Sequence, residues 1–339
     1  MSKEVHTESG EPQKTDIPPS VAKETLRTNE GQVDYLEIGQ ENPDANPIVI
    51  VPGFTQGVEV LEDFGAELSR LGDRQVFVLD QLKRDDKSWE GPKPFSREGR
   101  LGLEQQTSTL LQFLSDRDLT EKPVDFIANS FGAPVAIRAA ELADRRGWSC
   151  FKAEAGSRMA LISPAASKKG EFLVPLGGRF AWWMGKNIGN SKFLDPDGSM
   201  MKAGIQNSME DLAKTTNEVR VLARTRLPYQ RLGEIGVKPV VFSYASDGLM
   251  PYRIMDSTLE PNMDQLSGIA TIVDPENIGA GSFREFKQKT GLSGKAAREA
   301  WAHHYRRADH SDHQFHPKRS AKAVLQVFEG KIGEVPIKH

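Results

Sequence analysis

The stretch that decides the fold reads Val124-Asp-Phe-Ile-Ala-Asn-Ser130-Phe-Gly-Ala-Pro-Val-Ala-Ile-Arg138. An apolar strand leads into a serine, and a helix follows. Ala128 and Gly132 lie two positions either side of Ser130, where a sharp strand-to-helix turn presses against neighbouring backbone and requires small residues. No other serine combines a small residue at minus two with glycine at plus two. We therefore predict a nucleophile elbow at Ser130, the alternative being a serine that only caps a helix.

Composition limits the possible partners. The 339 residues carry a net charge of −3, which favours neither a nucleic acid nor an anionic membrane as partner. The N-terminal residues are polar and no apolar run approaches membrane-spanning length, so we expect a soluble, cytoplasmic protein. Cys150 is the single cysteine, which excludes an intrachain disulfide and a cysteine-based zinc site. The oligomeric state is left open.

Buried strands alternate with amphipathic helices along much of the chain, which predicts an α/β fold with a mostly parallel, doubly wound sheet. A continuous apolar run such as 47–52 is typical of a parallel strand covered on both faces. We expect strands at 32–38, 47–52, 74–80, 124–129, 159–163 and 238–247, and helices at 60–71, 101–114, 131–146 and 317–329.

The alternation stops after Pro164. Residues 167–231 contain aromatic residues and methionines among helical stretches but no convincing strand. We interpret them as a helical cap inserted into a core formed by 23–166 and 232–339, with ordered structure beginning near Thr25. Residues 1–22 are rich in charge and proline, which predicts a disordered tail.

A nucleophilic serine needs a base, and the base needs a carboxylate to orient it. Asp247 ends the strand that follows the cap, at the sheet edge where ligands bind in open α/β folds. An Asp-Gly turn without catalytic duty is the alternative. Histidines crowd into one segment before the last helix: His303, His304, His310, His313 and His316.

This chain order of serine, acid and histidine resembles the α/β-hydrolase superfamily. The segment Asp309-His310-Ser-Asp-His313-Gln-Phe-His-Pro317 is similar to the family's closing pattern, in which the catalytic histidine precedes a proline that opens the last helix. The resemblance assigns the base to His310, with His313 as the fallback. The other three histidines of the segment are expected to be surface or core residues.

The reaction also requires two backbone donors for an oxyanion. One is expected to be the N–H of Phe131, at the start of a helix whose dipole favours negative charge. Pro52-Gly53-Phe54-Thr55 resembles the family's oxyanion loop, and the resemblance makes Phe54 the second donor. A simple glycine turn is the alternative.

The chain departs from the family pattern at three points near the expected site. Pro52 replaces the usual histidine of the oxyanion loop, and Asp309 stands where glycine often precedes the base. The separation of Asp247 from His310 is longer than one helix and one strand require, so an insertion is expected around 261–294. The acid could then be another residue, the candidates being Asp256, Asp264 and Asp274.

The resemblance implies a serine hydrolase that cleaves a small apolar carboxylic ester or a related acyl bond through an acyl-enzyme, with no metal or organic cofactor. Cap residues Trp182, Trp183 and Met184 are expected to line the substrate pocket, the alternative being that they only pack the cap onto the sheet. Two other classes stay open. One is a metal-dependent hydrolase that uses the His303–His316 cluster, and the other is a ligand-binding homologue without turnover.

Overall fold

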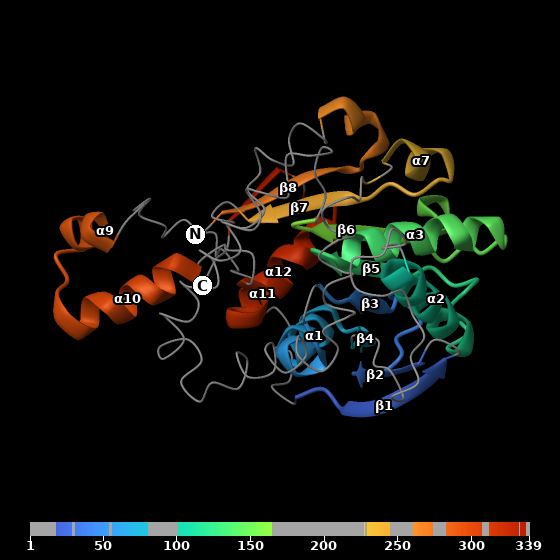
Figure 1. The fold of residues 1–339 in the computed structure, drawn as a ribbon, viewed down its shortest axis with the longest axis horizontal. Helices are drawn as coiled ribbons and strands as arrows, with labels where there is room; N and C mark the ends of the chain where they lie inside the picture. The colour runs from blue at the N-terminus through green and yellow to red at the C-terminus, as the bar shows by residue number, and fades with distance from the viewer. Residues whose placement is uncertain are drawn as a thin grey trace, which may run out of the picture.

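A computed structural model describes residues 18–28, 31–53, 56–80, 101–164, 227, 229–244, 260–273, 283–306, 312–331 and 333–336. Strands from these ranges form one nine-stranded sheet in the order β1-β2-β4-β3-β5-β6-β7-β8-β9 (Figure 1). β1 pairs antiparallel with β2, and β2 antiparallel with β4, whereas every later pair is parallel. The strands are β1 Val21–Thr28, β2 Gly31–Ile38, β3 Ile48–Val51, β4 Val76–Leu79, β5 Asp125–Asn129, β6 Arg158–Ile162, β7 Val240–Tyr244, β8 Gly268–Val273 and β9 Gly333–Pro336.

Helices cover both faces of this sheet, because its central strands are apolar on both sides. In β3, Val49 and Val51 belong to one buried apolar cluster while Ile48 and Ile50 belong to the other. The first cluster includes residues of α2 (Leu101–Asp116), α3 (Gly132–Arg145) and α7 (Tyr229–Glu234). The second includes residues of α1 (Val58–Gly72) and α12 (Pro317–Phe328), which pack against each other.

Among the described residues, three further helices lie between β8 and α12 in the chain. The short α11 (Asp312–Phe315) contacts both α1 and α12. α9 (Phe283–Thr290) and α10 (Gly294–Arg306) lie to one side of the sheet in Figure 1 and pack through Phe286 and Trp301. Two 3₁₀ turns complete the described elements, η1 (Ala153–Ala155) and η2 (Glu260–Gln265).

The predicted α/β fold class is confirmed, and the strands and helices expected in the described ranges are present with small shifts of their ends. β1 starts at Val21, inside the predicted tail and before Thr25, because it is an exposed edge strand without a buried face to mark it. The range 261–294, expected to be an insertion, contains the regular strand β8. β9 was not predicted. Residues 165–226, most of the predicted cap, lie outside the described residues.

Candidate active site

Ser130 occupies the turn between β5 and α3. Its backbone φ is +48°, a left-handed conformation that non-glycine residues rarely adopt and that recurs at functional sites. Its N–H donates to the Ile162 carbonyl of β6 at 2.9 Å, which fixes the turn to the carboxyl edge of the sheet. The strand, strained turn and helix together form the nucleophile elbow that the sequence around this serine suggests.

Gly132 explains why the turn needs a small residue at plus two. A Cβ placed there would lie 2.4 Å from the Val51 carbonyl oxygen and 2.8 Å from that of Pro52. These backbone atoms lie at the end of β3 and in the residue after it, and they cannot move aside as a side chain would. The start of α3 is therefore pressed directly against the segment that leads into the predicted oxyanion loop.

The predicted oxyanion donor Phe131 is the N-cap residue of α3 and is fully buried. Its N–H forms no hydrogen bond with another residue in the described part of the chain. The Ser130 side-chain oxygen likewise has no hydrogen-bond partner among the described residues, although only 8% of Ser130 is exposed. A free backbone donor at a helix start, beside a hydroxyl, is suited to stabilising negative charge.

The loop after β3 contributes a second feature. The Gly53 N–H donates to Oε1 of Gln56 at 2.6 Å, and the Gln56 N–H donates to the Gly53 carbonyl at 3.2 Å. Gly53 thus uses its own amide within the loop. Phe54, the predicted second oxyanion donor, is the next residue and lies outside the described residues.

His313 is the predicted histidine that the described structure brings to this edge. It lies on α11, is 1% exposed, and packs edge-on against Phe64 with ring centroids 5.5 Å apart. Its Nε2 lies 3.1 Å from Nε2 of Gln56 and 3.3 Å from Nδ2 of Asn129, the residue before Ser130. Gln56 and Asn129 were missed by the sequence analysis. Other predicted site residues lie outside the described residues: Asp247, His310, Trp182, Trp183 and Met184.

A carboxylate beside this histidine has other partners. Asp312 is fully buried and accepts a hydrogen bond from Ser320 Oγ at 2.7 Å, with Nδ1 of His316 at 3.0 Å and Arg319 at 3.3 Å. These contacts hold α11 against the first turns of α12. Among the described residues no three His, Cys, Asp or Glu side chains are grouped to hold a metal ion. Of the acids kept as alternatives to Asp247, only Asp264 is described, in η2; Asp256 and Asp274 lie outside the described residues.

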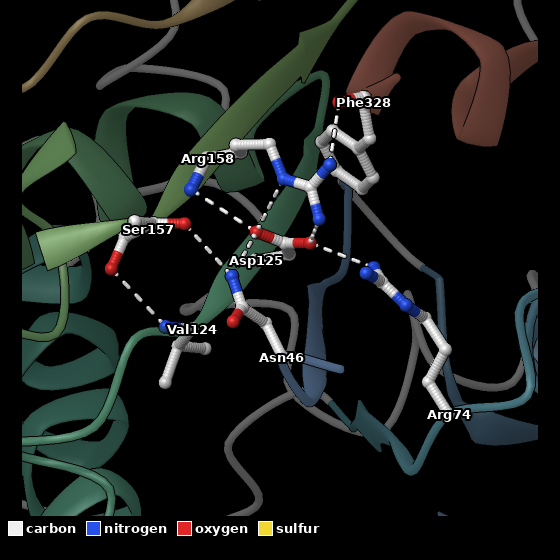
Figure 2. Close-up of polar contacts among 8 residues, drawn as sticks. Asn46, Arg74, Val124, Asp125, Ser157, Arg158 and Phe328 are labelled. Carbon is white, nitrogen blue, oxygen red and sulfur yellow. Dashed lines mark hydrogen bonds and ion pairs between the residues drawn. The ribbon is translucent and has the colours of Figure 1, made fainter. Parts of the chain in front are cut away.

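The other end of β5 carries a separate buried polar cluster (Figure 2). Asp125 is fully buried and forms ion pairs with Arg74 at 2.7 Å and with Arg158 at 2.6 Å. Asn46 donates to its Oδ1 at 3.0 Å. Arg158 also donates to the Phe328 carbonyl, which joins this cluster to the last residue of α12. These charges are paired with one another, as expected of a structural network.

Comparison with known proteins identifies the fold. No protein-family model and no curated sequence matches the chain. Among solved structures, a bacterial membrane phospholipase A is similar at 13% identity, with 91% of this chain and 86% of that chain covered and a TM-score of 0.56. A bromoperoxidase from Bacillus anthracis aligns at 11% identity over 91% and 100% of the two chains (TM-score 0.55). A serine hydrolase from Cycloclasticus zankles aligns at 13% over 92% and 99% (TM-score 0.54).

These likenesses agree with the strand order of the sheet. The chain has the α/β-hydrolase fold. Separately, no helix among the described residues combines the length and the apolar character that a membrane crossing requires.

Proposed function

We propose that this protein is a serine hydrolase that cleaves a carboxylic ester or a related acyl bond. The observation that carries the proposal is the strained conformation of Ser130 at the carboxyl edge of the sheet, directly before the N–H of Phe131, which has no partner among the described residues. A nucleophile and an oxyanion donor are adjacent at this point. Neighbours of the same fold include a serine hydrolase and a phospholipase, which supports acyl chemistry as the reaction class.

In the proposed mechanism, the base removes the Ser130 hydroxyl proton while the oxygen attacks the acyl carbon. The N–H groups of Phe131 and Phe54 stabilise the oxyanion, and the protonated base then gives its proton to the leaving alcohol. Water, deprotonated by the same base, attacks the acyl-enzyme. The acid is released and the proton returns to Ser130.

We assign the base to His310 and its orienting acid to Asp247. Nε2 of His313 already faces the amide groups of Gln56 and Asn129, which argues against the fallback base. His310 lies two residues before Asp312 in the chain, and Asp247 lies three residues after the end of β7. In the chain, Asp247 thus follows the carboxyl end of a parallel strand, which is the edge where ligands bind in open α/β folds.

The substrate is proposed to be a small apolar ester held by the cap, with Trp182, Trp183 and Met184 against its acyl or aryl group. A panel of p-nitrophenyl esters of increasing acyl length measures this preference. Turnover that does not change with acyl length would contradict an apolar acyl pocket.

Labelling with a fluorophosphonate tests the nucleophile. Wild type is expected to be labelled and Ser130→Ala is not. Ser163→Ala is the matched control, because Ser163 also has a positive φ, +43°, and directly follows the neighbouring strand β6. Labelling of Ser130→Ala would refute the assignment, and chelator-sensitive hydrolysis without labelling would favour the metal-dependent alternative. Full ester turnover by His310→Ala would refute the base.

A further inference from the structure

We propose that Gln56, Asn129 and His313 form an amide–imidazole cluster that holds the two oxyanion-donor loops in register, with His313 neutral and protonated on Nδ1. The three side chains are buried, with 7%, 2% and 1% exposed. They come from the loop after β3, from the end of β5 and from α11. The proposal rests on the proposed function, since it assigns a positioning role at that site.

The orientation of each amide follows from one fixed donor. The Gly53 backbone N–H can only donate, so the Gln56 atom 2.6 Å away must be its carbonyl oxygen. That oxygen also accepts from Nδ2 of Asn129 at 3.1 Å. If the Asn129 amide were turned over, two carbonyl oxygens would face each other, so its orientation is fixed as well.

The histidine tautomer follows from the two amides. With its oxygen toward Gly53, Gln56 presents Nε2, a donor, to Nε2 of His313 at 3.1 Å. Asn129 Nδ2 is a second donor at 3.3 Å. The ring nitrogen must therefore accept, so Nε2 carries no proton and the neutral ring carries it on Nδ1. An imidazolium would direct an N–H at two amide N–H groups.

Other groups packed against the ring do not favour its charged form. Phe64 of α1 lies edge-on, and Tyr244 of β7 is stacked with centroids 6.5 Å apart. The nearby charges of Asp312 and Arg319 are paired with each other. Among the described residues, the aromatic rings packed against His313 are neutral, which agrees with a neutral imidazole.

The cluster connects the residues that precede the two proposed oxyanion donors. Gln56 holds the amide of Gly53, which precedes Phe54, and Asn129 is two residues before Phe131. The backbones are already in close contact, since a Cβ on Gly53 would lie 3.2 Å from the Asn129 carbonyl oxygen. Displacing reacting groups by about 1 Å can cost about 100-fold in rate, so side chains that fix this spacing affect catalysis without touching substrate.

Turnover of a p-nitrophenyl ester tests the positioning role. Gln56→Met keeps the length of the side chain but removes its acceptor and donor, and we expect kcat to fall about 10- to 100-fold with KM nearly unchanged. Gln56→Glu keeps the acceptor for Gly53 but places an anion against His313. We expect the pH profile of kcat to differ in shape from that of wild type. Asn46→Ala is the matched control, because it removes hydrogen bonds to Asp125, at the opposite end of β5, and to Gly156, and should leave kcat unchanged.

Nitrogen-15 NMR of the histidine ring tests the tautomer without relying on activity. His313 is expected to show an unprotonated Nε2 and a protonated Nδ1 at neutral pH, with His313→Gln used to assign the signals. A proton on Nε2, or wild-type kcat in Gln56→Met, would overturn the cluster. Loss of Ser130 labelling in the wild type would instead overturn the proposed function, and the NMR result would still decide the tautomer.

Discussion

Buried polar groups at the two ends of β5 have different kinds of partners. At the amino end, the Asp125 carboxylate is surrounded by two guanidinium groups and an amide, and each ion pair is 2.6 or 2.7 Å long. At the carboxyl end, four residues later, Asn129 takes part in a network of neutral amides and an imidazole. The next residue, Ser130, has a strained backbone.

This difference shows which features distinguish a candidate site from a structural cluster. Burial alone does not, because both ends are almost fully buried. Charge alone would select the wrong end, since the ionic cluster around Asp125 is complete. The carboxyl end differs in its left-handed serine, in a hydroxyl and a backbone N–H without described partners, and in backbone packed too tightly for any residue but glycine.

The largest effect on stability is expected at the amino end. Asp125→Asn leaves two guanidinium groups without their anion, and we expect the free energy of unfolding to fall by about 3 kcal/mol, the low end for a broken buried pair because Arg158 is partly exposed. Urea unfolding measures this loss, with the exposed Asp44→Asn as control. Ser130 labelling per folded molecule should not change. A loss of labelling without a loss of stability would mean that the amino end of β5 serves the site and is not a structural cluster.

A steric change at the carboxyl end should affect stability and reactivity together. Gly132→Ala forces a methyl group against the Val51 carbonyl, and we expect about 1–3 kcal/mol of destabilisation and slower fluorophosphonate labelling. Gly65→Ala is a useful control, because its Cβ would meet side-chain atoms of Val78 and Ile38 instead of backbone. That variant should lower stability while leaving the labelling rate unchanged; equal labelling rates in both variants would contradict the role of the interlocked loops.

Backbone strain at Ser130 predicts a smaller effect. Glycine adopts a positive φ without the penalty that alanine retains, so we expect Ser130→Gly to be more stable than Ser130→Ala by about 1 kcal/mol. Thermal and urea unfolding compare the two variants. The same pair of substitutions at Ser163, which also has a positive φ, is a second test of the effect. Equal stability of the glycine and alanine variants at Ser130 would mean that the turn is not strained.

The thiol of Cys150 is a probe of burial, and we expect it to react hardly at all with a disulfide reagent in the native protein. Burial raises the pKa of its thiol from 9.0 to about 12, so at pH 8 it stays protonated and should react with a disulfide reagent only after opening. As the pH rises from 9 toward 12, the folded state loses stability because only the unfolded thiol ionises freely. The next residue, Phe151, stacks on Phe126 of β5, so Asp125→Asn should accelerate the reaction. Rapid reaction of the wild type at pH 8 would contradict this burial.

Sequence reasoning located the elements that carry a clear period or a clear turn. The continuous apolar runs at β3 and β5 and the small residues around Ser130 are local signals, and the structure contains each of these elements. β1 was missed because an exposed edge strand shows no buried face. β8, although apolar and β-branched, lies in a range whose unusual length suggested an insertion. Gln56 and Asn129 were missed because nothing local distinguishes a glutamine or asparagine that meets a distant histidine.

By itself, the sequence determined the α/β class and the elbow at Ser130, because strand period, helix period and turn chemistry depend on neighbouring residues. The assignments of Asp247, His310 and Phe54 remain predictions from order and resemblance. Only the tertiary structure decided that Gln56, Asn129 and His313 meet, since they are separated by 73 and 184 residues along the chain. Their hydrogen-bonding partners, and with them the proton position on His313, depend on how the parallel strands and α11 are brought to one edge of the sheet.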